Sequence, residues 1–375
     1  MRTPTLNARR RTRGMSLVEL MVAVGISSSL IAGAVFSYAE YRRVYSVSEV
    51  LARVQEQARF AMGTIEPDIE LAGFYGFSNN PDSIRWVRGS APGTVLATAP
   101  RLRQRPLPPL AAAPVPAPDL DASAQACGTN FAVDVSIPVQ GSNNGFLLGP
   151  GADASCDPYG TGAVGTSDTL TLRRAATVAS AAEAGRLQIY ASRFSSRTVQ
   201  LMFADGVVPG PINDDNRVHD FIVRAYYIAR DSVDRRGVPA LRVKALSRNG
   251  GVPAFIDNEV MPGVEDLQVQ FGIDSGDYDN DGAVDSSVDA NGDGVPESDG
   301  RATRYVNPDF PGLDRLQVVS VRIWLRVRGD QLEPGFIDDR TYRYADVEYT
   351  PAGADRAFRR VLLTRTIALR NARIL

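Results

Sequence analysis

The hydrophobic pattern divides the chain into a long helical beginning and a strand-rich remainder. Residues 20 to 39 contain no charged side chain. At about 1.5 Å per residue they form roughly 30 Å of helix, the thickness of a bilayer core. Apolar residues then recur every three or four positions, at Val44, Val47, Leu51, Val54, Ala58, Met62, Ile65 and Ile69. This spacing places them on one helical face.

We therefore expect one helix that spans a membrane over residues 15–39 and continues through residues 40–77 into an exported domain. Pro67 and Gly73 mark where this helix weakens or ends, because proline lacks a backbone donor and glycine favours a helix terminus. The apolar stripe predicts that the second half of the helix lies on a sheet.

Beyond the helix, segments that alternate apolar and polar residues are separated by Gly, Pro, Asn and Asp, which is typical of half-exposed antiparallel strands. The predicted strands are residues 131–139, 168–174, 186–193, 198–204, 220–230, 241–248, 264–274, 316–329 and 358–371. Residues 91–121 are rich in proline and predict an extended surface excursion. The expected fold class is α+β, with a β-rich region over residues 78–375.

Charge at the beginning of the chain indicates its orientation. Residues 1–14 contain five arginines and no acid, so removing them changes the formal charge from −2 to −7. The positive-inside rule keeps this leader in the cytoplasm and sends the residues after Glu40 across the membrane. The other arginines are scattered and matched by 43 acids, so no nucleic-acid partner is expected.

Two cysteines, Cys127 and Cys156, fall in the exported part, where a disulfide can persist. A bond between them would enclose 28 residues and contribute about 3–4 kcal/mol in the chain-entropy model. The alternative is two unpaired thiols.

Three kinds of N-terminal segment fit this beginning. A secretory signal would be cut after Ala39, a signal anchor would stay uncut, and a third kind would be cut after Gly14, leaving Met15 as the new N-terminus. Glu19 distinguishes these three kinds of segment, because a carboxylate within a membrane-spanning helix usually has a binding partner and a function.

The motif RGMSLVEL, residues 13–20, resembles the class III signal of type IV prepilins. The resemblance implies cleavage between Gly14 and Met15 by prepilin peptidase, and methylation of the new amine. It also implies that Glu19 neutralises the N-terminal amine of a neighbouring subunit. Met15 departs from the family, in which phenylalanine is commonest at this position.

A narrower resemblance rests on four segments. QEQARFAMGTIEPDIELAGFYGF (55–77), VEDLQVQFGID (264–274), SVRIWLRVRG (320–329) and FRRVLLTRTIALRN (358–371) are similar to the PilW family of type IV pilus assembly proteins. This implies a pilin-like fold and a minor pilin that primes or caps the fibre at its tip. The implied partners are other minor pilins, the major pilin and a large tip adhesin. Residues 80–215 contribute nothing to the resemblance.

The segment 274–300 contains nine acids and no base. Alternating oxygens ahead of glycines suit Ca²⁺, so we expect a calcium site formed by Asp277, Asp279, Asp281, Asp285, Asp289, Asn291, Asp293 and Glu297. The twelfth loop positions hold Val288 and Gly300 instead of a bidentate acid. The site should therefore be weak, on the order of 10⁻⁴ to 10⁻³ M. The alternative is a solvated acidic loop.

No catalytic site is expected. His219 is the only histidine and adjoins Asp220, but no nucleophile-elbow sequence accompanies it, and a turn or strand-start histidine is the simpler interpretation. The chain also contains neither a phosphate-binding GxxxxGK[ST] motif nor a CxxC motif. Two other functions stay open: a pseudopilin of type II secretion, and a periplasmic enzyme or binding protein with a signal cut after Ala39.

Overall fold

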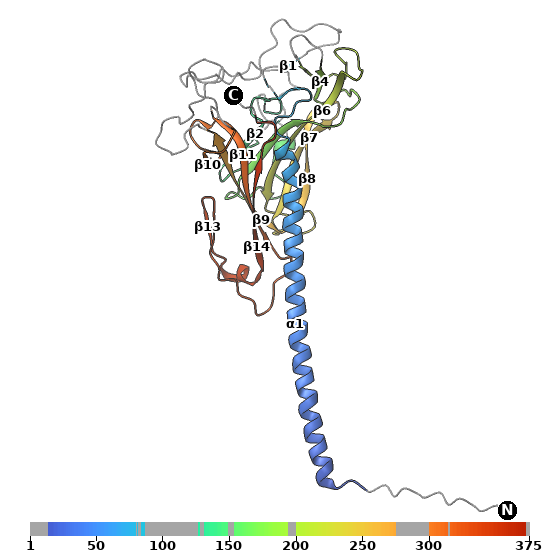
Figure 1. Ribbon diagram of the computed structural model, residues 1–375, viewed down its shortest axis with the longest axis vertical. Helices are drawn as coiled ribbons and strands as arrows, with labels where there is room; N and C mark the ends of the chain where they lie inside the picture. The colour runs from blue at the N-terminus through green and yellow to red at the C-terminus, as the bar shows by residue number, and fades with distance from the viewer. Residues whose placement is uncertain are drawn as a thin grey trace, which may run out of the picture. The chain divides into compact units, whose positions relative to one another are not determined.

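The computed structural model describes residues 14–79, 81, 84–86, 127, 131–148, 154–193, 200–274, 300–313 and 316–372 (Figure 1). The chain divides into two compact units, Met1–Arg53 and Val54–Leu375. Helix α1, Leu17–Glu70, contributes residues to both units. Three predicted regions lie outside the described residues: leader residues 1–13, the proline-rich excursion 91–121, and residues 275–299 of the Asp-rich loop.

Helix α1 ends earlier than its predicted bound at residue 77. Pro67 lies inside the helix and does not end it, since its carbonyl still accepts the Leu71 N–H at 3.2 Å. The chain turns at Gly73, whose φ of 80° is the left-handed conformation that glycine adopts at low cost. The N–H of Gly73 then donates to the carbonyl of Arg173 at 3.0 Å, which joins the end of the helix to a strand.

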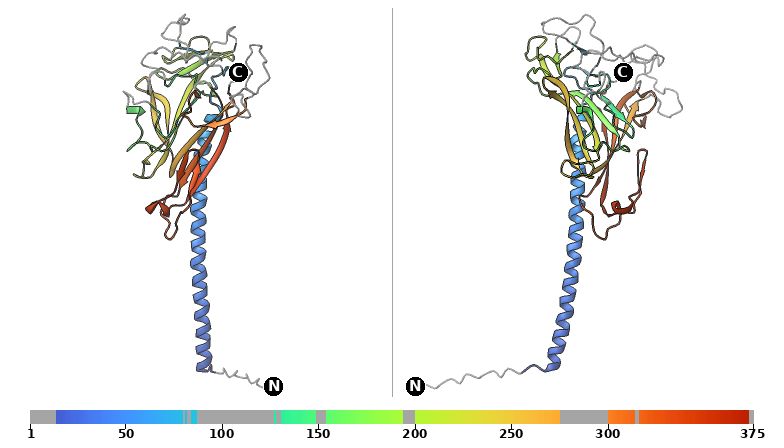
Figure 2. Two further views of the ribbon diagram at one scale, coloured as in Figure 1. Left: turned by 90° about the vertical axis from the view of Figure 1, so that its left-hand side faces the viewer. Right: turned by 180° about the vertical axis from the view of Figure 1, so that it is seen from behind.

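The predicted apolar stripe is buried only in the second unit. Val44 and Leu51 are exposed. The buried positions of α1 are Val54, Ala58, Ala61, Met62, Ile65 and Ile69. These side chains pack in the core because strands of two sheets lie on either side of the last turns of α1 (Figures 1 and 2). The prediction that this part of the helix lies on a sheet is confirmed.

The larger sheet has eight strands within the described residues. They are β1 (Ile84–Trp86), β2 (Val139–Ser142), β3 (Thr169–Ala175), β4 (Gln188–Ser192), β5 (Gln200–Phe203), β6 (Asn216–Ala229), β7 (Ala240–Asn249) and β8 (Val252–Pro262). Six follow the order β1-β5-β4-β6-β3-β2, and β7 and β8 extend the sheet from β6. Pairing is antiparallel except between β1 and β5.

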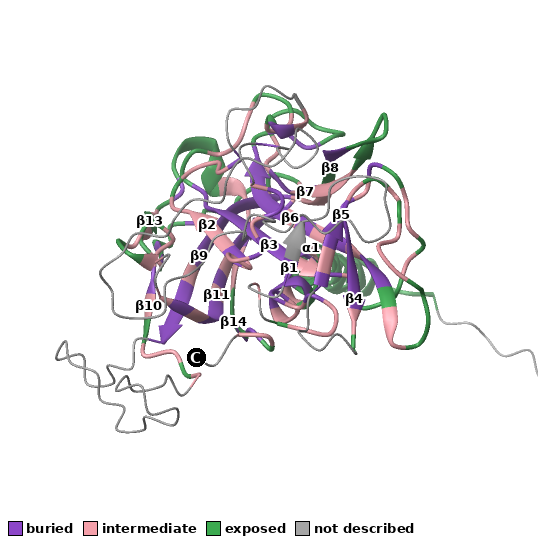
Figure 3. Ribbon diagram, turned by 90° about the horizontal axis from the view of Figure 1, so that it is seen from above, coloured by how far each residue is buried: buried purple, intermediate pink, exposed green. Residues whose placement is uncertain are grey.

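A second, four-stranded antiparallel sheet contains β9 (Val264–Asp274), β10 (Arg304–Val306), β11 (Gln317–Arg328) and β14 (Arg360–Ala368) in the order β10-β9-β11-β14. A separate pair joins β12 (Tyr342–Tyr344) to β13 (Val347–Tyr349), and short 3₁₀ turns occur at Ala154–Cys156 and Gly353–Ala357. The central strands β9 and β11 are buried along most of their length (Figure 3). The chain is therefore α+β, as predicted.

The predicted strand at residues 131–139 is wrong: residues 131–137 form turns, and only Val139 enters β2. Ala132, Val133 and Val135 are nevertheless fully buried. Side chains satisfy the carbonyls in this segment, since Arg173 donates to Phe131 O and Ile137 O, both at 2.8 Å. The apolar alternation here therefore reflected burial without a ladder of strand hydrogen bonds.

Asp68 ties α1 to the larger sheet. One carboxylate oxygen accepts hydrogen bonds from Arg174 at 2.8 and 3.0 Å. The other oxygen accepts from Arg224 at 2.8 Å and from the Tyr226 hydroxyl at 2.6 Å. Asp68 is buried, so the two arginines and the tyrosine hydroxyl compensate for its lost hydration.

The second sheet also contains paired buried charges. Glu265 of β9 accepts hydrogen bonds from Arg326 at 3.1 Å and from Arg360 at 2.8 and 3.0 Å. The neighbouring Asp266 accepts from the hydroxyls of Ser167 at 2.5 Å and Tyr344 at 2.6 Å. These bonds connect β9 to β11, β12, β14 and the segment before β3, and they explain how a strand with acidic residues is buried.

Candidate functional site

The start of α1 forms a capping box. Ser16 precedes the first helical residue, and its hydroxyl accepts the Glu19 N–H at 3.1 Å. In return, the Glu19 carboxylate accepts the Ser16 N–H at 2.9 Å. This reciprocal pair satisfies two backbone donors that a helix start otherwise leaves without partners. Ser16 was not among the predicted functional residues, although its S-x-x-E spacing to Glu19 is a known signal of a capping box.

The capping box holds the Glu19 side chain in position within the single chain, without a neighbouring subunit. A carboxylate in the first turn also interacts favourably with the positive end of the helix dipole. Cleavage between Gly14 and Met15 would leave the Met15–Ser16 peptide bond intact, so the Ser16 N–H would still be available to Glu19. The capping bonds between Ser16 and Glu19 therefore do not require the residues before Met15.

The first part of α1 presents its apolar side chains to its surroundings. It contains a stretch long and apolar enough to span a membrane, and none of that stretch is buried within the chain. The hydroxyls of Ser28 and Ser29 donate to the carbonyl of Gly25 at 2.9 and 3.0 Å. Because these polar groups are satisfied inside the helix, the stretch is compatible with hydrocarbon.

The two cysteines are joined. The Cys127–Cys156 disulfide has a Cα–Cα distance of 5.3 Å, and both residues are buried. The adjacent Ser155 carbonyl accepts a hydrogen bond from Lys244 Nζ at 2.8 Å, and the same amine pairs with Asp257 at 3.0 Å. The predicted disulfide thus lies in the hydrophobic core, next to polar contacts that join the 3₁₀ turn, β7 and β8.

The eight predicted calcium ligands, from Asp277 to Glu297, lie outside the described residues. The two ends of their segment are joined: Asp274 accepts the Gly300 N–H at 2.8 Å, and Arg304 of β10 pairs with Ile273 of β9. Within the described residues, no group of three or more histidine, cysteine or acidic side chains is arranged to hold a metal ion.

His219 lies within β6 instead of at a turn or strand start. It is buried, and its Nδ1 lies 2.8 Å from the carbonyl of Ala176. Burial lowers the pKa of this imidazole, because the charged form loses hydration. The adjacent Asp220 accepts a hydrogen bond from the Ser180 hydroxyl at 2.7 Å. The ring is thus held by a backbone carbonyl in the core.

Comparison with known proteins adds family matches at both ends of the chain. Residues 225–371 match the family model of the type IV pilus-assembly protein W, and residues 9–35 match the prokaryotic N-terminal methylation motif. A type IV-like pilin from Thermus thermophilus is similar at 14% identity, over 55% of this chain and 79% of that chain, with a TM-score of 0.24. No curated protein matches the sequence.

The N-terminal methylation motif lies at the start of an apolar helix, and antiparallel sheets follow that helix, as the resemblance to type IV prepilins implied. The region that matches the PilW family model begins in β6 and includes the whole second sheet. The resemblance predicted from the sequence is confirmed. The matches indicate a structural component of a pilus, and the apolar helix is consistent with anchoring in a membrane.

Proposed function

We propose that this chain is a minor pilin that primes or caps a type IV pilus at its tip. Prepilin peptidase cleaves it between Gly14 and Met15, and the inner membrane holds it with the second unit in the periplasm until assembly. Its partners are other minor pilins, the major pilin and a large tip adhesin. One observation carries this proposal: an exposed apolar helix begins with the carboxylate of Glu19, in a chain that also contains a PilW region.

The proposed assembly step follows from the cost of burying Glu19. When apolar helices pack together, water leaves the surroundings of this carboxylate, and an unpaired charge there is expensive. The α-amine of a neighbouring processed subunit is a suitable counter-charge, and the attraction strengthens as the effective dielectric constant falls. Glu19 would then exchange its capping bond to Ser16 for a bond between subunits.

Glu19→Gln separates the two tasks of this side chain. Glutamine retains the capping geometry, because its amide oxygen can accept the Ser16 N–H, but it cannot neutralise an amine. We expect Glu19→Gln and Glu19→Ala to impair pilus assembly equally while leaving processing and the second unit intact. Pili counted by electron microscopy in a strain lacking the wild-type chain provide the measurement. Glu49→Gln is the matched control, since this exposed acid of α1 pairs with Arg53, four residues further along the same helix.

Normal pilus numbers with Glu19→Gln would contradict the charge role of this residue. The mass of the mature chain tests processing independently: a mature N-terminus at Glu40 would indicate the periplasmic enzyme or binding protein considered above. Restored type II secretion without restored pili would favour the pseudopilin.

A further inference from the structure

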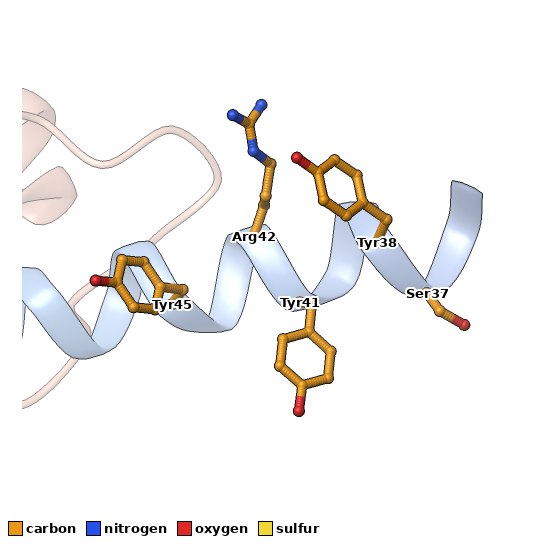
Figure 4. A pocket seen from close by; sticks show the side chains of 5 residues that line it. All are labelled: Ser37, Tyr38, Tyr41, Arg42 and Tyr45. Atoms are coloured by element: carbon orange, nitrogen blue, oxygen red, sulfur yellow. The ribbon is translucent and has the colours of Figure 1, made fainter. Parts of the chain in front are cut away.

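Three tyrosines and one arginine form a band on α1 in the first unit. Tyr38, Tyr41, Arg42 and Tyr45 recur at three- and four-residue spacing, which places them on one broad face of the helix. The tyrosines are 62%, 79% and 72% exposed, in chain order. With Ser37 they line an open groove of about 340 Å³ (Figure 4). We call these four residues the tyrosine band.

The band begins where the uncharged run ends. Tyr38 lies in the last turn of residues 20–39, and Tyr41 and Tyr45 follow Glu40. Tyr45 lies seven positions after Tyr38, which is about 10 Å along the helix axis. The headgroup layer of one leaflet is roughly 5–8 Å thick. If the uncharged run fills the hydrocarbon, the band extends through the headgroup layer that follows it.

The chemistry of the band suits phospholipid headgroups. Tyrosine has an apolar ring and a polar hydroxyl, and it is enriched where one end of a side chain is in hydrocarbon and the other in water. The Arg42 guanidinium carbon lies 5.4 Å from the centroid of the Tyr38 ring. This cation can therefore pair with a lipid phosphate while its stem covers apolar surface.

We infer that the tyrosine band binds the phospholipid headgroups of the periplasmic leaflet and sets the depth at which the helix waits in the membrane before assembly. This inference rests on the membrane storage in the proposed function. A second pilin helix is the competing occupant. Glu40 and Arg42 lie next to the tyrosines in the sequence. Their charged side chains are more stable in the hydrated headgroup layer than between packed apolar helices.

The test uses the full-length chain in vesicles of phosphatidylethanolamine and phosphatidylglycerol. Because both native cysteines are disulfide-bonded, a cysteine introduced at Ala34 or at Ser48 is the only free thiol and accepts one spin label. Collision of the label with oxygen and with a water-soluble nickel chelate measures its depth. We expect the label at position 34 to lie in hydrocarbon and the label at position 48 to lie in water.

Replacing Tyr38, Tyr41 and Tyr45 together by serine should move both labels toward water by about 5 Å, one helical turn. Replacing all three by tryptophan should preserve the depth, because tryptophan has the same preference for the interface. The double variant Ala39→Ser/Val44→Ser is the matched control. It changes the same stretch without touching the band and should leave the labels in place.

Unchanged depth in the triple serine variant would overturn the inference, and unchanged depth with fewer pili would assign the band to contacts between pilins. If the wild-type chain does not float with vesicles, membrane storage itself is wrong. That outcome is distinct from a failure of the band alone, in which the wild-type chain floats and the serine variant keeps its depth.

Discussion

Asp68 is the residue at which α1 is tied to the larger sheet, and its partners are two arginines and a tyrosine. Asp68→Ala would leave the two arginines and the tyrosine hydroxyl without their buried hydrogen-bond acceptor. We expect the free energy of unfolding to fall by about 3–5 kcal/mol, the usual cost of removing one partner from a buried ion pair. Urea unfolding of the full-length chain in detergent micelles, followed by near-ultraviolet circular dichroism, measures it.

The control for Asp68 is an exposed ion pair in the same unit. Glu348 pairs with Arg343 at 2.7 Å, and both side chains are largely exposed. Glu348→Ala should therefore change the free energy of unfolding far less than Asp68→Ala does, because exposed ion pairs contribute little to stability. Equal effects of the two substitutions would show that Asp68 is not an anchor.

The hydrogen bonds of Asp231 predict that the stability of the fold depends on pH. Its carboxylate accepts the Thr161 hydroxyl at 2.6 Å and the N–H groups of Thr161 and Gly237 at 2.9 and 2.8 Å. These bonds favour the ionised form and lower the pKa of Asp231 from 3.8 to about 2. The unfolded chain therefore takes up this proton at higher pH than the folded chain does.

The stability that Asp231 contributes is present above pH 4 and is lost as the pH falls toward 2. Asp231→Asn should flatten the fall in stability over this interval, measured by melting temperature at successive pH values. Asp234→Asn, a change of an exposed acid in the same loop, should leave the pH profile unchanged. An unaltered profile in Asp231→Asn would contradict the prediction.

At the scale of elements, the sequence predicted strands well where one face is buried and the other is not. It missed β8, whose Pro253 and Pro262 interrupt the alternation; the edge position of this strand tolerates proline. A signal was present: Asn249 pairs with Val252 across Gly250 and Gly251, both with positive φ. Two such residues between strands are typical of a tight hairpin.

The sequence indicated some of the important residues and not others, and the reason is physical. Glu19 and the cysteine pair stand out because each is unusual in its sequence context. Asp68 does not, because its importance comes from Arg174 and Arg224, which lie more than 100 residues away in the chain. Contacts between residues so far apart in the chain produce no local sequence pattern, so the sequence alone does not reveal them.

The β7–β8 hairpin supplies a test of close packing. A Cβ atom added at Gly185, where φ is 81°, would lie 2.4 Å from the backbone of Gly251. Gly185→Ala should therefore both strain the backbone and displace the hairpin, and we expect a loss of at least about 2 kcal/mol in the free energy of unfolding.

Gly250→Ala is the control for that substitution. Gly250 also has a positive φ, of 57°, but a Cβ there meets no atom within 4 Å. Only the conformational cost applies, about 1 kcal/mol. The same unfolding measurement applies to both variants, and a larger loss for Gly250→Ala would show that the hairpin does not approach Gly185 closely.

For the whole molecule, the Asp-rich segment stays a predicted calcium site. The described residues on either side of it are joined through the pairing of β9 with β10. Millimolar Ca²⁺ acting on a site of about 10⁻⁴ M should add roughly 1.4 kcal/mol of stability. Melting the full-length chain in chelator and then in calcium, with Asp281→Ala and Asp293→Ala as controls, measures this. No shift in the wild-type chain would leave only a solvated acidic loop.

Lys244 makes amine chemistry selective in this protein. It is the only lysine in the sequence, and its buried amine lies against Asp257 and the Ser155 carbonyl. An activated ester applied to the folded chain should therefore acylate a single accessible amine, the α-amine at the beginning of the chain. In processed protein this is the amine of Met15, so a fluorescent ester would tag that end alone, and its protection during polymerisation could be followed directly.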